Sequence, residues 1–255
     1  METAVKFILI GCLIQDVLCV FKISLPATIE ALEGSCVFIP CTFDINEDKH
    51  VLTESVTRKW LKHGSSDSEV FISQSPNSGT HKGEIFGKPT EKNCTTRIDN
   101  VRKPDSGEYY FRIESENLSY SYKNGSTHSH PGVKIDVVES PSKPKVQLYD
   151  DQMKVKVHQV VMEDSSASLR CSAKIYCPFN PPTLTWSSSS NTILILNDHQ
   201  HHDQTKLISD LNFKITHLHH GVTFTCTIKY QLKNQIKTEQ ASIHYMFSMP
   251  LKTHQ

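Results

Sequence analysis

Arg112 is the residue whose type and position first suggest chemistry. It ends the run Asp105-Ser106-Gly107-Glu108-Tyr109-Tyr110-Phe111-Arg112. Tyr109 and Phe111 are expected to face a core, and because side chains alternate along a strand, Tyr110 and Arg112 then face outward. An outward arginine in isolation is usually a solubilising surface residue. Its planar guanidinium is also suited to pairing with a carboxylate through two parallel hydrogen bonds.

Other residues with chemical potential form weaker patterns. The clusters His199-Gln200-His201-His202-Asp203 and His217-Leu218-His219-His220 contain metal-ligand types. Structural zinc sites need four ligands at defined spacing, so we predict solvated loop and corner histidines and no metal. Gly-x-Ser-x-Gly, His-Glu-x-x-His, phosphate-loop and dinucleotide glycine motifs do not occur in the sequence. The pattern favours a binding protein without a cofactor over an enzyme.

Charge excludes another class of function. The chain of 255 residues has 27 Lys+Arg and 27 Asp+Glu, and its formal net charge is +0. A dedicated electrostatic binder of nucleic acid or of an anionic membrane would carry a clear excess of positive charge. We therefore expect no nucleic-acid partner.

Short strands must position these residues. The chain alternates runs rich in Val, Ile, Thr, Tyr and Phe with polar clusters containing Gly, Pro and Asn, and no long amphipathic helix pattern occurs. Such spacing predicts an all-β sandwich fold. The segment Ser140-Pro141-Ser142-Lys143-Pro144-Lys145 is the clear linker. It divides the chain into two parts, each near the ~100 residues of a single sandwich domain.

The second part carries the core signature of an immunoglobulin domain. Cys171, Trp186 and Cys226 follow one another in the order expected when a disulfide joins the two sheets and the tryptophan packs on it. Phe224 takes the place of the usual corner tyrosine, whose hydroxyl is therefore missing.

The first part departs from this signature in one position. Cys41, Trp60 and the corner residue Tyr109 match it, but Phe111 stands where the second cysteine belongs. Cys94 lies in the preceding strand, which neighbours the strand of Cys41 in one sheet. We predict a Cys41–Cys94 disulfide within that sheet, leaving the two sheets free to splay.

The first residues predict export. Lys6 precedes the apolar run Phe7 to Ile14, which is shorter than the ~20 residues needed to span a bilayer but has the length of a signal-peptide core. A buried N-terminal strand is the alternative. We predict a secreted or extracellular protein, or the outer part of a longer cell-surface receptor, because no second apolar stretch of membrane length follows.

Removal of the leader leaves an even number of cysteines, which in an exported chain indicates disulfides. Six cysteines allow 15 pairings. Cys36 lies where its strand begins, near the linker, and Cys177 lies just beyond a strand in a loop expected to face the first domain. This placement favours a Cys36–Cys177 bridge between the domains beside Cys171–Cys226.

Several of these motifs resemble one family. The run Gly34 to Phe43, and Tyr109-Tyr110-Phe111-Arg112 combined with the relocated Cys94, resemble the sialic-acid-binding immunoglobulin-like lectins, or Siglecs. In the second part Leu169-Arg170-Cys171, Cys177-Pro178, Trp186 and His220-Gly221 are similar to the second Siglec domain. The resemblance implies two tandem immunoglobulin-like β-sandwiches, V-set then C2-set. The expected divisions are a signal peptide (1–19), a V-set domain (20–140), a C2-set domain (141–247) and a tail (248–255).

The resemblance also implies a function. Arg112 matches the arginine that pairs with the carboxylate of sialic acid. Phe21 and Tyr120 match the aromatic residues that support the sugar, and the backbone of Ser119 and Ser121 would bind its edge. The implied partners are sialylated glycans on glycoproteins or glycolipids. The alternative is an adhesion or immune-receptor ectodomain that binds a protein ligand through the same sheet.

Three sequons fit an exported glycoprotein. Asn93, Asn117 and Asn124 each begin an Asn-x-Ser/Thr motif. Asn117 is close in sequence to the expected site, so a glycan there would affect access to it.

Overall fold

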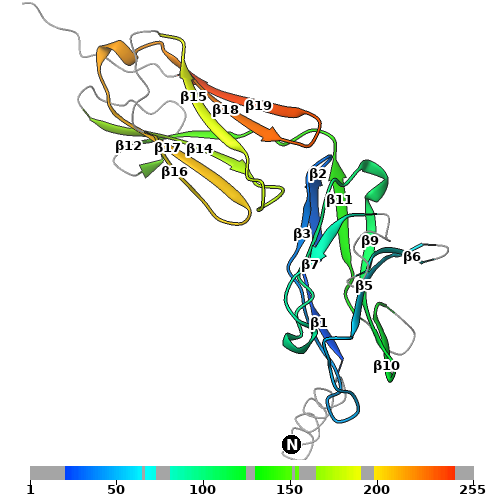
Figure 1. Cartoon of the computed structure of the whole chain (residues 1–255). Helices are drawn as coiled ribbons and strands as arrows, with labels where there is room; N and C mark the ends of the chain where they lie inside the picture. The colour runs from blue at the N-terminus through cyan, green and yellow to red at the C-terminus, as the bar shows by residue number, and fades with distance from the viewer. Residues whose placement is uncertain are drawn as a thin grey trace, which may run out of the picture. The chain divides into compact units, whose positions relative to one another are not determined.

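The computed structural model describes residues 21–64, 67–72, 81–124, 130–150, 153–154, 165–190 and 198–244. The predicted signal peptide and C-terminal tail lie outside these ranges. The chain separates into two compact units, Met1–Val138 (unit 1) and Glu139–Gln255 (unit 2), each built from strands (Figure 1). Within the described ranges, no helix is long and apolar enough to cross a membrane.

Unit 1 contains strands of three to nine residues and two short 3-10 helices. Its elements are β1 (Lys22–Ser24), β2 (Thr28–Leu32), β3 (Val37–Ile39), β4 (Thr42–Asp44), β5 (Thr57–Lys62), β6 (Ser68–Ile72), β7 (Gly83–Ile85), η1 (Pro89–Glu91), β8 (Thr96–Ile98), η2 (Lys103–Asp105), β9 (Gly107–Ser115), β10 (Leu118–Tyr122) and β11 (Val133–Val138).

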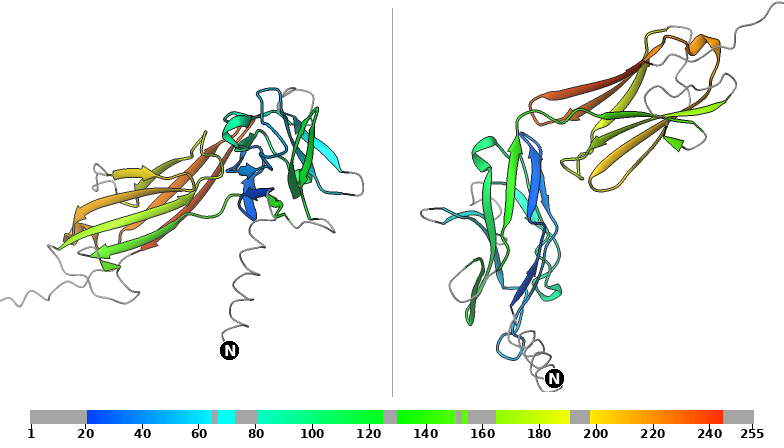
Figure 2. Two further views of the ribbon diagram at one scale, coloured as in Figure 1. Left: turned by 90° about the horizontal axis from the view of Figure 1, so that it is seen from below. Right: turned by 180° about the vertical axis from the view of Figure 1, so that it is seen from behind.

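The strands of unit 1 form two layers (Figure 2). The front sheet has the order β2-β11-β9-β5-β6, and β10 also pairs with β9. The back sheet has the order β3-β8-β7, and β1 pairs with β4. Buried and exposed side chains alternate along the strands, as in β11, because each sheet has one face on the core and one in solvent. An extra strand beside β5 on the front sheet is the variable-type arrangement.

Phe111 fills the place of the missing cysteine in the core of unit 1. Its ring is fully buried and lies 5.4 Å from Trp60 and 5.3 Å from Phe43, measured between ring centroids. Trp60 Nε1 donates a hydrogen bond of 2.7 Å to Thr96 Oγ1 on the back sheet. The packed aromatic rings and the hydrogen bond between Trp60 and Thr96 thus help to join the two sheets.

The disulfide between Cys41 and Cys94 joins two adjacent segments of the same layer, which lead into β4 and β8. Cys41 and Cys94 are bonded, with their Cα atoms 4.8 Å apart. The Cys94 amide also donates to the Cys41 carbonyl at 3.0 Å. Tyr109 Oη donates to the Asp105 carbonyl at 2.6 Å, which is the tyrosine-corner contact.

Unit 2 has longer and more regular strands. Its elements are β12 (Lys145–Asp150), β13 (Met153–Lys154), β14 (Ser166–Lys174), β15 (Thr183–Ser188), β16 (Asp198–His202), β17 (Lys206–Lys214), η3 (His217–His219), β18 (Thr223–Gln231) and β19 (Ile236–His244). One sheet has the order β13-β12-β14-β17-β16 and the other β15-β18-β19. This is the constant-type division of strands. The predicted all-β fold of two tandem immunoglobulin-like sandwiches is confirmed.

The core of unit 2 has the expected disulfide. Cys171 on β14 and Cys226 on β18 are bonded and fully buried. Trp186 packs against them, and its Nε1 donates to Ser209 Oγ at 3.0 Å. Phe224, at the corner position, is buried against Phe213. Cys36 and Cys177 are also disulfide-bonded, and their pairing with each other stays a prediction.

Candidate functional site

Arg112 projects from the middle of the front sheet. It lies on β9 between Phe111 and Ile113, both fully buried, so the alternation of the strand directs Arg112 outward. Across the sheet it is in register with Lys59 on β5 and Ser121 on β10. Its side chain is 32% exposed, so the guanidinium is accessible but partly enclosed by its neighbours.

The guanidinium of Arg112 is held on all three nitrogens. Nε donates to Glu114 Oε1 at 2.6 Å, Nη1 to Ser121 Oγ at 2.7 Å, and Nη2 to Ser119 Oγ at 2.9 Å. One of these acceptors is a carboxylate and two are neutral hydroxyls. The structure therefore brings Arg112, Ser119 and Ser121 together through their side chains.

Glu114 links Arg112 to a row of charges on the same face. Its other oxygen, Oε2, lies 2.7 Å from Lys59 Nζ, and Lys59 in turn lies 2.9 Å from Glu69 Oε1. Lys59, and then Arg112, hold the pKa of Glu114 below its usual value in spite of partial burial. Glu114, and next Glu69, raise the pKa of Lys59. Glu114 and Lys59 are therefore both charged at neutral pH.

A second polar cluster lies next to Arg112 on this face. Tyr110 Oη donates to Asp67 Oδ2 at 2.9 Å, and Lys123 Nζ lies 3.0 Å from the same oxygen. Lys123, followed by Tyr110, holds the pKa of Asp67 well below its usual range. Burial, and then the bond to Asp67, raise the pKa of Tyr110 to about 12. A small cleft lies beside this cluster, lined by His63, Glu108, Tyr109, Tyr110, Lys123, Asn124 and Gly132.

The two aromatic residues expected at the site lie on the other side of β10. Tyr120 is in register with the buried Ile113, whereas Ser119 and Ser121 are on the side of Arg112. Phe21 stacks on Tyr120 with ring centroids 3.8 Å apart, and Tyr120 Oη is hydrogen-bonded to His130 Nε2 at 2.6 Å. Residues 119 to 121 alternate across the strand, so Tyr120 lies on the opposite face of β10 from Ser119 and Ser121, and its support of the sugar stays a prediction. Phe21 and Tyr120 pack against the core of unit 1, on the face of β10 opposite to Ser119 and Ser121.

The three sequon asparagines are in different surroundings. Asn117 is exposed in the turn between β9 and β10, and Asn124 is exposed just after β10. Asn93 is half-buried, and its Oδ1 accepts a hydrogen bond of 2.8 Å from the Thr95 amide. Ser119 completes the Asn117 sequon and also contacts Arg112, so this sequon and the site share a residue.

The histidine clusters of unit 2 are divided between surface and interior. His199, His201 and His202 are exposed on the edge strand β16. His219 is buried in η3, where its Nδ1 lies 3.0 Å from the Thr216 amide, and burial lowers its pKa. Searched over the described ranges, the His, Cys, Asp and Glu side chains form no group of three or more suited to a metal ion.

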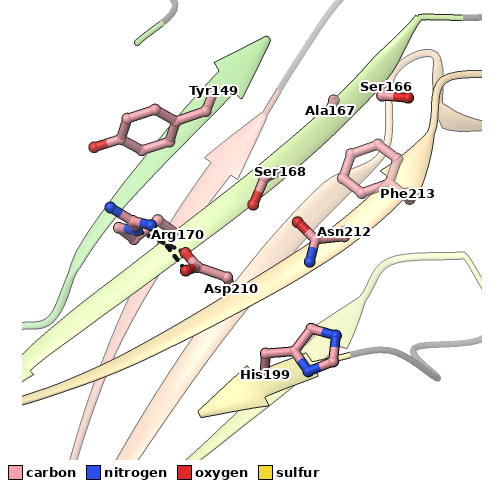
Figure 3. A pocket seen from close by; sticks show the side chains of 9 residues that line it. All are labelled: Tyr149, Ser166, Ala167, Ser168, Arg170, His199, Asp210, Asn212 and Phe213. Atoms are coloured by element: carbon pink, nitrogen blue, oxygen red, sulfur yellow. Dashed lines mark hydrogen bonds and ion pairs between the residues drawn. The ribbon is translucent and has the colours of Figure 1, made fainter. Parts of the chain in front are cut away.

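Unit 2 has a hollow on the outer face of its larger sheet, lined by both polar and apolar side chains (Figure 3). Arg170 and Asp210 point toward each other there and form a bidentate pair, with Nε–Oδ1 of 2.6 Å and Nη2–Oδ2 of 2.9 Å. The Arg170 guanidinium also lies 5.0 Å from the centre of the Tyr149 ring. The arginine of this hollow already pairs with a carboxylate through both arms of its fork, unlike Arg112.

Glu114 and Lys59 are the residues that the sequence interpretation missed. The available signal was the alternation that directs Arg112 outward, because it also directs Glu114, two residues later on the same strand, to the same face. Lys59 precedes the buried Trp60 and is outward by the same reasoning. The contact of Glu114 with Arg112 depends on side-chain conformation, and the contact of Lys59 with Glu114 depends on strand register; the sequence specifies neither.

Curated proteins similar to this chain are sialic-acid-binding Ig-like lectins. Sialic acid-binding Ig-like lectin 13 of Pan troglodytes is 25% identical over 67% of the chain, and Sialic acid-binding Ig-like lectin 5 of Homo sapiens is 24% identical over 87%. Myeloid cell surface antigen CD33 of Mus musculus is 28% identical over 86%. The chain covers 42%, 38% and 51% of the lengths of these three relatives, in that order.

Other comparisons add less. No protein-family model matches the chain. Among solved structures, the crystal structure of Rst D1-D2 is 18% identical with a TM-score of 0.34 over 89% of this chain and 100% of its own, which is too low to support an argument. The resemblance to Siglecs noted in the sequence is confirmed by the curated relatives.

Proposed function

We propose, for a chain that resembles the sialic-acid-binding Ig-like lectins, that unit 1 binds sialylated glycans on the cell surface or in the extracellular fluid. In this proposal Arg112 pairs with the carboxylate of sialic acid. The observation that carries it is the outward position of Arg112, with its Nη1 and Nη2 on the neutral hydroxyls of Ser121 and Ser119. A ligand carboxylate is a stronger acceptor than a hydroxyl, because charge-assisted hydrogen bonds are about twice as strong as neutral ones.

The rest of the site suits a small polar ligand. In the free protein Ser119 and Ser121 accept hydrogen bonds from Arg112. When a ligand carboxylate takes their place on the guanidinium, the serine hydroxyls are able to donate hydrogen bonds to that carboxylate or to sugar hydroxyls. β10 pairs only with β9 among the strands that the structure describes, so its other edge offers backbone groups to the sugar. Phe21 and Tyr120 hold this edge strand in place.

The energetics make Arg112 decisive. A millimolar Kd corresponds to about 4 kcal/mol in total, and a hydrogen bond to a charged group contributes about 1.5–3 kcal/mol. Loss of the guanidinium would remove much of the affinity of such a site. Lysine would keep the charge and lose the fork. Weak single sites become useful when several copies engage together, as on a cell surface.

The test is binding of the clustered chain to a sialoglycan array, for wild type and Arg112→Ala. Arg97→Ala is the matched control, since Arg97 is a strand arginine on the back sheet that pairs with an acid two residues later, Asp99, at 2.9 Å. On the array we expect Arg112→Ala to lose binding and Arg97→Ala to bind like wild type. In a second assay on target cells, sialidase treatment of the cells should abolish binding of the wild-type chain. Binding that survives both would refute the proposal and indicate a protein ligand on the front sheet.

A further inference from the structure

Glu114 blocks one of the two edges by which Arg112 is able to bind a carboxylate. A guanidinium accepts a bidentate carboxylate either side-on, through Nε and one Nη, or end-on, through Nη1 and Nη2. The Nε–H of Arg112 is already donated to Glu114 Oε1 at 2.6 Å. Among the described residues, the groups that hold the end-on edge are the hydroxyls of Ser119 and Ser121.

Glu114 is also the hardest of the three partners to displace. Its second oxygen is held by Lys59 at 2.7 Å, and Lys59 is anchored in turn by Glu69. Because Lys59 and Arg112 lower the pKa of Glu114, it stays ionised at neutral pH. An incoming carboxylate that displaced it would break charge-assisted bonds to two cations, whereas displacement of the serines breaks bonds to neutral oxygens.

We propose that Glu114, anchored by Lys59, is a positioning residue that fixes the plane of the Arg112 guanidinium and directs the ligand carboxylate to its Nη1–Nη2 edge. This inference rests on the proposed function of Arg112. Fixing the fork before binding reduces the side-chain freedom that must be lost when the ligand binds. A carboxylate that acted only through its negative charge would instead repel the ligand.

The variants Glu114→Gln and Glu114→Ala separate these roles. Glutamine keeps an oxygen that accepts from Nε and loses the charge, while alanine removes both. Affinity for the methyl α-glycoside of N-acetylneuraminic acid is measured by NMR titration of the full chain. We expect Glu114→Ala to weaken binding about 3- to 10-fold and Glu114→Gln to stay within about twofold of wild type. Stronger binding by both variants, or no change in either, would overturn the inference.

Two matched control variants test whether the effect is specific to Glu114. Glu116→Gln removes a neighbouring exposed charge from the β9–β10 turn, and Asp99→Ala breaks the equivalent arginine–acid pair on the back sheet. Both should bind like wild type. If either weakens binding as much as Glu114→Ala, the effect is not specific to Arg112 and the inference fails.

The NMR resonance of the Arg112 Nε–H distinguishes a positioning role of Glu114 from a purely structural one. In the free protein this proton should exchange slowly with solvent because it is hydrogen-bonded to Glu114. The substitution Glu114→Ala should therefore shift its resonance even without ligand. Saturating sialoside should leave it nearly in place in wild type and shift it strongly in Glu114→Ala. A large ligand-induced shift in wild type would show side-on binding and contradict the inference. If wild type does not bind while the free-state shift is present, the proposed function has failed, and the assignment of a ligand edge fails with it.

Discussion

At the scale of single residues, the position of Arg112 follows from its two neighbours. Phe111 and Ile113 are apolar and buried, so the residue between them must face outward. This much could be predicted from the sequence, because Phe111 occupies a recognisable core position. The partners of Arg112 could not, since Glu114, Ser119 and Ser121 reach it through side-chain conformations and strand register that alternation alone does not specify.

Ser119 has two roles that substitutions can separate. Asn117→Gln removes the sequon and leaves the Arg112 contact, Ser119→Ala removes both, and Ser119→Thr keeps both. Because the Asn117 side chain lies in the turn next to Ser119, a glycan there should restrict access. We expect Asn117→Gln to strengthen binding, Ser119→Thr to bind like wild type, and Ser119→Ala to bind more weakly than Asn117→Gln. Mass spectrometry of the glycopeptide and array binding of each variant check this, and equal binding by Asn117→Gln and Ser119→Ala would contradict it.

Asp67 predicts how acid affects unit 1. Its pKa is depressed in the folded state by Lys123 and then by Tyr110. Its contribution is therefore fully present above the pKa of an unfolded aspartate, about 3.9, and is lost as the pH falls below that value. We expect Asp67→Asn to lower the Tm at pH 7 and the difference from wild type to shrink below about pH 4. Calorimetry from pH 7 to pH 2.5 measures this, and a difference that is constant with pH would show that the ionised form of Asp67 has no stabilising role.

At the scale of elements, β10 determines the shape of the site. Its two faces have separate roles: Ser119 and Ser121 contact Arg112 in front, while Tyr120 packs on Phe21 and bonds to His130 behind. The resemblance predicted that Tyr120 supports the ligand, and this role stays a prediction. Alternation applied to residues 119 to 121 would have placed Tyr120 behind, whereas its contact with Phe21, about a hundred positions earlier in the sequence, requires the folded structure.

Tyr120 should act on binding through the order of β10. Aromatic pairs contribute about 0.5–1.5 kcal/mol beyond the area they bury. Tyr120→Ala is therefore expected to destabilise unit 1 by about 1–3 kcal/mol and to weaken ligand binding. Hydrogen exchange should be faster at the amides of β10 and unchanged in β5. Weakened binding with wild-type exchange in β10 would indicate that Tyr120 contacts the ligand directly.

At the scale of the whole molecule, each unit is stabilised in its own way. Unit 2 has a disulfide between its two sheets, at Cys171 and Cys226, as its Cys…Trp…Cys pattern predicts. Unit 1 has its disulfide within one layer and an aromatic core around Phe111 between the layers. The departure of unit 1 was predictable because Phe111 replaces a cysteine at a fixed position. The way Trp60, Phe43 and Thr96 fill the gap was not, because it depends on packing in three dimensions.

Removal of the unit 1 disulfide should affect unit 1 selectively. Cys41 and Cys94 are 53 residues apart in sequence, a loop for which cross-linking contributes about 2–4 kcal/mol. We expect Cys41→Ala/Cys94→Ala to lower the free energy of unfolding of unit 1 by this amount. Fluorescence of Trp60 and Trp186, observed separately in single-tryptophan variants during denaturation, measures the two units. A shift of the Trp186 transition equal to that of Trp60 would contradict independent cores.

The most direct test of the pairing between Arg112 and a carboxylate compares two ligands and two proteins. Methyl α-sialoside and its carboxamide analogue are titrated against wild type and Arg112→Lys. Each guanidinium hydrogen bond to the carboxylate is expected to contribute about 1.5–3 kcal/mol, equivalent to roughly 10- to 150-fold in Kd. Wild type should therefore prefer the acid by at least about tenfold, and Arg112→Lys should lose most of this preference. Equal binding of acid and amide by wild type would contradict the pairing.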